Sequence, residues 1–286
     1  MGRVLNRGTF ARGKGLLLVI DTHAHLTDES LFSRIDTVLE EAHAAGVGAI
    51  LAVATDLSTS LRCLELAKRP RLDRTSAVRA SVGIHPNYCA AADPGDFEQI
   101  RQLALEQPIA ALGETGLDRH WDDSPWDMQV DFFRQHIELA RETGHPLIIH
   151  TRDCAEETLA LLQAEMQLGR FRAVMHSFTG PPAVAEGCLE LGLMISFAGM
   201  VTFKNAAELR SIAKMIPADR LLVETDSPYL TPHPYRGQRP NRPALVVHTL
   251  ACLAEVRGCR PAELAEQTTR NAESLFGPWS PSTLGT

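Results

Sequence analysis

Seven histidine and acidic residues close or directly follow short apolar runs of the sequence. They are His23, His25, His85, Glu114, His150, His176 and Asp226. Imidazole nitrogens and carboxylate oxygens are ligands of zinc and manganese, and of magnesium when it keeps more of its waters. If the apolar runs are parallel strands of one barrel, their carboxyl ends meet at a single mouth. The pattern therefore predicts a metal site with hydrolytic chemistry.

The first ion is predicted from the ends of the first and last apolar runs. His23 and His25 are two residues apart, so on an extended strand both imidazoles point to the same face. Asp226 follows the run LLVET, and in a closed barrel the eighth strand lies beside the first. We expect these three residues and Glu114 to bind one divalent cation.

The second ion is predicted to share Glu114, which lies in GETGLD and can reach across the mouth. His150 in HTRD and His176 in HSFTG each close a hydrophobic run; either one alone would be more typical of a packed, hydrogen-bonded histidine. Two ions about 3.5–4 Å apart polarise a phosphoryl oxygen and generate hydroxide near neutral pH. In some metal-dependent hydrolases with a barrel fold, a carboxylated lysine bridges the two ions. That ligand is excluded here, because none of the four lysines stands at a strand end. They are Lys14, Lys68, Lys204 and Lys214.

In this scheme of two divalent ions (Mg, Mn or Zn), no coordination position is left for His85, which lies in VGIHP. We expect it to hydrogen-bond a substrate oxygen or the leaving group, the alternative being a buried structural histidine. The catalytic roles are thus assigned to Asp226, Glu114 and His85. Arg152, Asp153 and Glu224 are expected to orient the ligands. Lys204 and Arg236 are either cations that hold a phosphate or solvated surface charges.

The elements that must position these residues alternate between apolar strands and amphipathic helices, which predicts a TIM (β/α)8 barrel. The eight expected strands are 16–22, 48–54, 77–84, 109–113, 146–150, 172–176, 193–197 and 221–225. One barrel domain is expected over 16–279, after a disordered basic extension (1–15) and before a flexible tail (280–286). Glycines before several strands are expected to end the preceding helices.

The composition is that of an ordinary globular protein, with 44% hydrophobic and 22% charged residues. No apolar run approaches the roughly 20 residues that span a bilayer, so no membrane association is expected. The net charge of −7 gives no overall basic surface, so any contact with nucleic acid must be local. Six cysteines without a CxxC pair favour reduced thiols and a cytoplasmic location. We expect a monomer.

Seven motifs in order carry a resemblance to the TatD family of metal-dependent deoxyribonucleases, within the amidohydrolase-like barrels. They are DTHAHL, GIHP, GETGLD, PLIIHTRD, HSFTG, ETDSPYL and YRGQRPNRP, from about Ile20 to about Phe276. The resemblance implies the barrel, the six ligands His23, His25, Glu114, His150, His176 and Asp226, and a place for His85 near the phosphate. It also implies metal-dependent hydrolysis of DNA, often from the 3′ end. The departures are Thr115, the Arg119-His120-Trp121 segment and Ser177, and none removes a ligand.

Two other functions compete with a 3′-5′ exonuclease on DNA. The same ions could polarise a carbonyl, as in a deacylase of mischarged aminoacyl-tRNA. A barrel that only binds is disfavoured, because buried imidazoles and carboxylates without an ion would be costly to keep together. The basic extension before Leu16 lies outside the usual family core, and the loop 119–125 at the mouth is a place where substrate preference could change.

Overall fold

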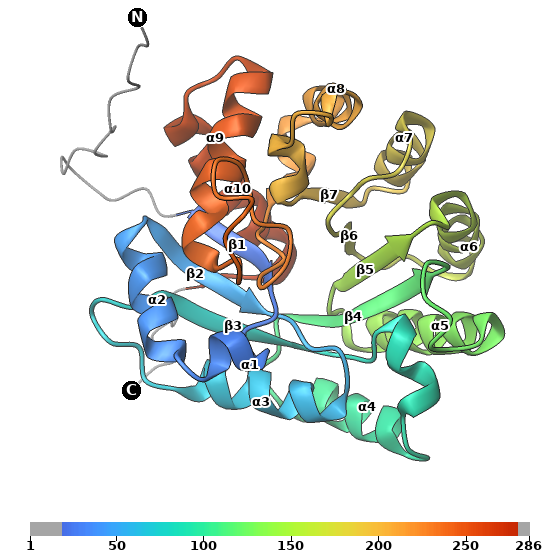
Figure 1. Ribbon diagram of the computed structural model, residues 1–286. Helices are drawn as coiled ribbons and strands as arrows, with labels where there is room; N and C mark the ends of the chain where they lie inside the picture. Colours follow the sequence, from blue (N-terminus) through green and yellow to red (C-terminus); the bar gives the residue numbers. More distant parts are fainter. Residues whose placement is uncertain (1–18, 280–286) are drawn as a thin grey trace, which may run out of the picture.

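Residues 19–279 are described by a computed structural model of the chain, and they form the predicted (β/α)8 barrel. Eight parallel strands are hydrogen-bonded in the order of the sequence, and Figure 1 shows them in the centre with helices around them. The strands are β1 (Val19–Ala24), β2 (Val47–Ala52), β3 (Ala77–Val82), β4 (Ala111–Asp118), β5 (Leu147–Arg152), β6 (Ala173–Met175), β7 (Met194–Phe197) and β8 (Leu221–Val223). The predicted extension (1–15), the tail (280–286) and the start of the first strand lie outside the described residues.

The helices follow the strands on the outside of the barrel (Figure 1). They are α1 (Glu29–Phe32), α2 (Ile35–Ala44), α3 (Leu57–Lys68), α4 (Asp96–Glu106), α5 (Trp126–Thr143), α6 (Ala155–Leu168), α7 (Pro182–Glu190), α8 (Ala207–Met215), α9 (Val246–Arg257) and α10 (Pro261–Phe276). As expected, a glycine follows α5: Gly144 caps the helix with φ of 74°, a left-handed conformation that glycine adopts without strain. No helix of the described part is long and apolar enough to cross a bilayer.

The hydrophobic core has two parts, separated by the wall of strands. Leu147 and Ile149 on β5 belong to the outer part, which also contains the buried faces of the helices. Ile148, between them, belongs to the inner part, because successive side chains of a strand point to opposite faces. Members of the inner part are Ile20, Leu51, Ile148, Val174, Met194 and Leu222 of the strands and Leu275, Phe276 and Trp279 near the end of the chain.

Several strand ends differ from the prediction. Glu114, expected just beyond a fourth strand that stops at residue 113, lies inside β4, which remains paired with β5 up to Asp118. Gly116 allows this pairing, because a Cβ at that position would collide with the carbonyl oxygen of His150. β8 was expected to end next to Asp226 but ends at Val223, where the last pairing with β7 occurs.

Candidate metal centre and active site

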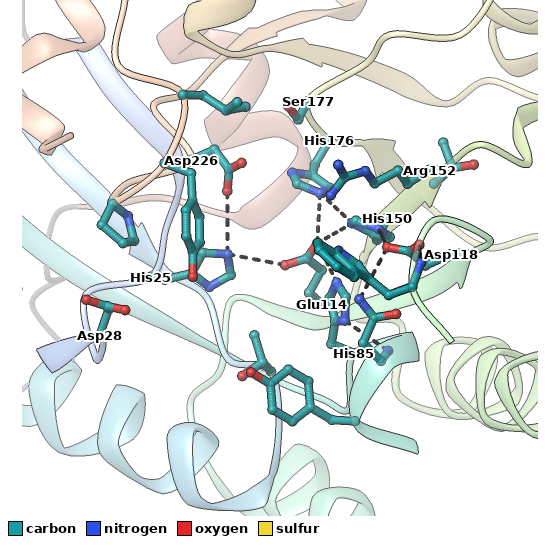
Figure 2. A pocket seen from close by; sticks show the side chains of 18 of the residues that line it. His25, Asp28, His85, Glu114, Asp118, His150, Arg152, His176, Ser177 and Asp226 are labelled. Carbon is teal, nitrogen blue, oxygen red and sulfur yellow. Dashed lines mark hydrogen bonds and ion pairs between the residues drawn. The ribbon is translucent and has the colours of Figure 1, made fainter. Parts of the chain in front are cut away.

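A cavity of about 1290 Å³ lies at the carboxyl ends of the strands. Six of the seven predicted site residues line it, namely His25, His85, Glu114, His150, His176 and Asp226. His23 is fully buried beneath them and contacts Glu114 and Asp226. Figure 2 shows the labelled members of this set converging from several strands. The fold therefore brings together the seven residues that the sequence predicted as ligands or catalytic groups.

The alternation of side chains along the strands explains part of this convergence. Ile148 and Val174 belong to the inner core, and His150 and His176 come two residues later on the same face. Each histidine therefore points toward the barrel axis one layer above the apolar interior. On β1, His23 lies within a register shift in the pairing with β2, between Asp21 and Ala24, and His25 directly follows the strand.

Asp226 is held against β1 by backbone hydrogen bonds where the barrel closes. Its amide donates to the carbonyl oxygen of His23 at 2.9 Å, and the His25 amide donates to Ser227 O at 2.7 Å. The buried carboxylate of Asp21 accepts from the Thr225 amide at 2.9 Å and from the Thr225 hydroxyl at 2.6 Å. These bonds place residues more than two hundred positions apart in sequence at one site.

The backbone at the mouth adopts unusual conformations. Among the described residues, the non-glycine residues with positive φ are Asp153, Ser177, Asp226 and Leu230, and all four line the cavity. Asp226 itself has φ of 55°. Such conformations cost about 1–3 kcal/mol each and are concentrated at functional sites, where the surrounding structure maintains them. The backbone conformations therefore indicate a functional site at this cavity, independently of its side chains.

The first group of possible ligand atoms surrounds one point. His23 Nε2 lies 3.2 Å from His25 Nε2, 3.3 Å from Glu114 Oε2 and 3.6 Å from Asp226 Oδ1. His25 Nε2 lies 3.5 Å from both of these carboxylate oxygens. Tetrahedral ligands about 2.0–2.2 Å from an ion are separated by roughly 3.3–3.6 Å. These four side chains therefore fit a divalent cation.

The second group uses the other oxygen of the same carboxylate. Glu114 Oε1 lies 2.8 Å from His176 Nε2, 2.9 Å from His150 Nδ1 and 3.6 Å from His85 Nε2. The two histidine nitrogens at the shorter distances are 3.4 Å from each other. Glu114 thus presents one oxygen to each group, as a carboxylate that bridges two cations would.

Three of the imidazoles have their outward nitrogen fixed by an acceptor. His25 Nδ1 faces Val53 O at 3.2 Å, His150 Nε2 faces Asp118 Oδ2 at 2.9 Å, and His176 Nδ1 faces Glu224 Oε1 at 3.2 Å. Because a carbonyl or carboxylate oxygen requires a donor, each outward nitrogen carries a proton. The inward nitrogen of the neutral ring then has a free lone pair, as a metal ligand needs.

His85 has the opposite arrangement. Its Nδ1 accepts a hydrogen bond from the Asn87 amide at 3.1 Å. The neutral ring must then carry its proton on Nε2, which faces the site as a donor rather than as a ligand. Burial, followed by the nearby His150, lowers the pKa of His85 to about 3, so the ring is neutral at pH 7.

The cluster also balances its charges internally. Burial would by itself raise the pKa of Glu114, but the imidazoles of His176 and His23 offset it and hold that pKa well below its usual value. Burial would by itself lower the pKa of His176, but the Glu114 carboxylate raises that pKa well above its ordinary value. A cation that binds at Glu114 would therefore displace a proton from His176.

Asp118 is a site residue that sequence reasoning missed. Its carboxylate faces His150 and accepts from the His120 and Trp121 amides at 2.7 and 3.2 Å. The available signal was its spacing of four from Glu114, which puts both carboxylates on one face if the strand continues. Glu224 contacts His176 as the sequence suggested.

Of the other residues predicted to support the site, some line the cavity and others have different contacts. Arg152 and Arg236 line the cavity, whereas Lys204 lines a separate, smaller hollow. Asp153 contacts His120 at 2.9 Å rather than one of the expected ligands.

Comparison with known proteins agrees with this geometry. Residues 20–277 match the model of the family described as TatD related DNase. The chain belongs to this family. The metal-dependent hydrolase YcfH of Escherichia coli K12 is 42% identical over 263 residues, covering 91% of this chain and 96% of YcfH. The protein named 3′-5′ ssDNA/RNA exonuclease TatD of Klebsiella pneumoniae is 35% identical, covering 91% and 98%.

The fold agrees with a solved TatD structure as well. YJJV, a TatD homologue from Escherichia coli K12, superposes with a TM-score of 0.85 at 29% identity, covering 92% of this chain and all of YJJV. The resemblance inferred from seven motifs is confirmed, including its extent. This chain is therefore a metal-dependent hydrolase of the TatD family with a TIM barrel.

Proposed function

We propose that this TatD-family hydrolase cleaves phosphodiester bonds of DNA from the 3′ end, using two divalent cations. The observation that carries the proposal is the orientation of Glu114, whose two oxygens face two separate groups of ligand atoms. A pair of cations sharing one carboxylate suits the displacement of an oxygen from phosphorus. The name of the Klebsiella relative supports DNA and the 3′ end.

The first cation would be held by His23, His25, Glu114 and Asp226, and the second by Glu114, His150 and His176. Bound Mg²⁺, Mn²⁺ or Zn²⁺ would polarise the phosphoryl group and make water nucleophilic near neutral pH. The outward hydrogen bonds to Asp118 and Glu224 fix the orientation of His150 and His176.

Two side chains act on the substrate and the attacking water. Asp226, held by its backbone beside His23, is positioned to accept the proton that the water loses. His85 donates from Nε2 to a phosphate oxygen or to the leaving oxygen, which stabilises the charge that develops there. Arg152, on the same side of the cavity as His150 in Figure 2, is placed to contact a neighbouring phosphate.

The test is cleavage of end-labelled single-stranded DNA by metal-stripped protein, before and after Mg²⁺, Mn²⁺ or Zn²⁺ is restored. We expect no cleavage without metal, release of 3′ nucleotides with it, and a loss of about a thousandfold or more in kcat for Asp226→Asn. Mischarged aminoacyl-tRNA serves as the competing substrate. Faster deacylation than DNA cleavage, or an Asp226→Asn enzyme with more than about a tenth of the wild-type rate, would overturn the proposal.

A further inference from the structure

The exposed aromatic side chains of the described part gather at one place. Trp121 is 51% exposed, Tyr229 56% and Tyr88 44%, and all three line the cavity. The other large exposed apolar side chains of residues 19–279 are aliphatic or methionine and lie elsewhere, namely Leu61, Leu72, Leu105, Met128, Leu168 and Met215. Exposing an aromatic ring to water is costly. Because the exposed aromatic rings are confined to the cavity, they point to a ligand that binds there.

Two of the three rings lie directly beside histidines of the site, the proposed ligand His25 and the proposed donor His85. The Tyr229 ring is 6.1 Å from the His25 ring, and the Tyr88 ring is 6.0 Å from the His85 ring. Both pairs meet edge to face. The tyrosines therefore flank the place where the reacting phosphate would sit.

Trp121 also lines the cavity, and its backbone is well anchored. Its amide donates to Asp118, and Gln129 Nε2 donates to the carbonyl oxygen of Ser124 at 2.9 Å. The Ser124 hydroxyl in turn accepts from the Ala90 amide at 3.0 Å, which joins this loop to the turn that carries Tyr88. The indole is thus presented on a loop that needs little ordering when a ligand binds.

The same cavity carries positive charge. Arg152, Arg236 and Arg239 line it, and the Arg152 guanidinium lies 5.7 Å from the Trp121 ring. Flat rings interleaved with cations are the features by which proteins bind single strands, whose unpaired bases stack while the cations contact phosphates. A duplex offers its bases already stacked on one another. The charge and the aromatic faces together favour a single strand.

We infer that Trp121, with Tyr88 and Tyr229, forms a surface on which the bases of the substrate stack. The inference rests on the proposed function and adds to it the residues that recognise the substrate. Stacking on one aromatic side chain contributes about 1–3 kcal/mol per base, so its loss weakens binding by about fivefold to 150-fold.

The experiment compares oligothymidylate with an abasic oligomer of the same length, which has the same phosphates but no bases. Fluorescence anisotropy gives Kd and cleavage gives KM for the metal-loaded wild type, Trp121→Ala and Trp121→Phe. We expect the wild type to prefer oligothymidylate, Trp121→Ala to lose about fivefold or more of that preference, and Trp121→Phe to keep most of it. Leu168→Ala, an exposed apolar side chain on α6 away from the cavity, is the control and should match the wild type.

The outcomes separate the two proposals. Equal preference in wild type and Trp121→Ala overturns the stacking surface and leaves the phosphodiesterase intact. A wild type that binds oligothymidylate over the abasic oligomer but cleaves neither overturns the proposed activity instead. Tyr229→Leu keeps an apolar side chain without a flat ring, and it supplies a second measurement should Trp121→Ala fold poorly.

Discussion

The histidines of the cavity differ in the partner of their outward nitrogen. His25, His150 and His176 face an acceptor there, whereas His85 faces the backbone amide of Asn87. The partner decides which nitrogen keeps the proton, and therefore whether the ring offers a lone pair or an N–H to the site. Distances alone would not make this distinction, because His85, Glu114 and His150 also lie close enough together to hold an ion.

We predict that His85→Ala keeps the metal content of the wild type but loses about a hundredfold in kcat, because a donor to the reacting phosphate is removed. His150→Ala, the matched variant on β5, should lose about one ion per chain. Elemental analysis of both purified proteins measures this difference. Loss of an ion from His85→Ala would show that its Nε2 is a ligand after all.

Most of the cluster was predictable because each residue stands beside an apolar run. The sequence indicated seven residues of the cluster, six that line the cavity and the buried His23, and the fold brings them together. Asp118 was missed because the fourth strand was expected to stop at residue 113, which placed it in a loop. The orientation of His85 depends on a contact with Asn87 that no spacing rule predicts.

At the scale of elements, a buried histidine of α5 supports the turn that carries His85. His136 Nε2 accepts from the Ile84 amide at 3.1 Å, and its Nδ1 lies 2.7 Å from Phe132 O. Phe97 of α4 packs against the ring edge to face at 4.9 Å. Both ring nitrogens are satisfied only in the neutral form, and burial lowers the pKa of His136 to about 4.

We predict that His136 makes the fold less stable in mild acid. Its folded pKa lies below the unfolded value of about 6.5, so its contribution is complete above pH 6.5 and is lost as the pH falls toward 4. Between pH 7.5 and 5 the loss is about 2 kcal/mol. Urea unfolding of wild type and His136→Gln at both pH values measures the part of this loss that is due to His136, because the other groups titrate alike in the two proteins. An unchanged pH dependence in the variant would contradict this role.

The elements themselves were predicted more reliably than their ends. Eight apolar runs became eight strands in sequence order, because a run buried on both faces is a strong signal for a parallel sheet. The extension of β4 to Asp118 depends on pairing with β5 across Gly116, which is a contact between distant segments. Local pattern carries no information about such pairing.

At the scale of the whole molecule, the last turn of α10 and the residues just after it contribute to the apolar interior of the barrel. Phe276 and Trp279 join the inner core of the barrel. Arg79, in the amino-terminal half of β3, donates to the carbonyl oxygens of Phe276 and Gly277, and its guanidinium lies over the Trp279 ring at 5.4 Å. Arg172 donates to Leu275 O at 2.9 Å. Two arginines, one in β3 and one directly before β6, thus satisfy the last carbonyls of α10.

Arg79→Ala should therefore lower the free energy of unfolding by about 2 kcal/mol, because hydrogen bonds from a charged donor contribute about 1.5–3 kcal/mol. Arg74→Ala, which removes an exposed arginine from the turn before β3, is the matched control and should change stability by less than about 0.5 kcal/mol. Urea denaturation measures both. Metal content should stay at the wild-type level in each variant, because Arg79 acts on the closed end of the barrel and the ligands stand at the opposite end of the strands. If Arg79→Ala loses metal as well as stability, the packing of α10 and the geometry of the mouth are coupled through the barrel wall, and the two ends are not independent.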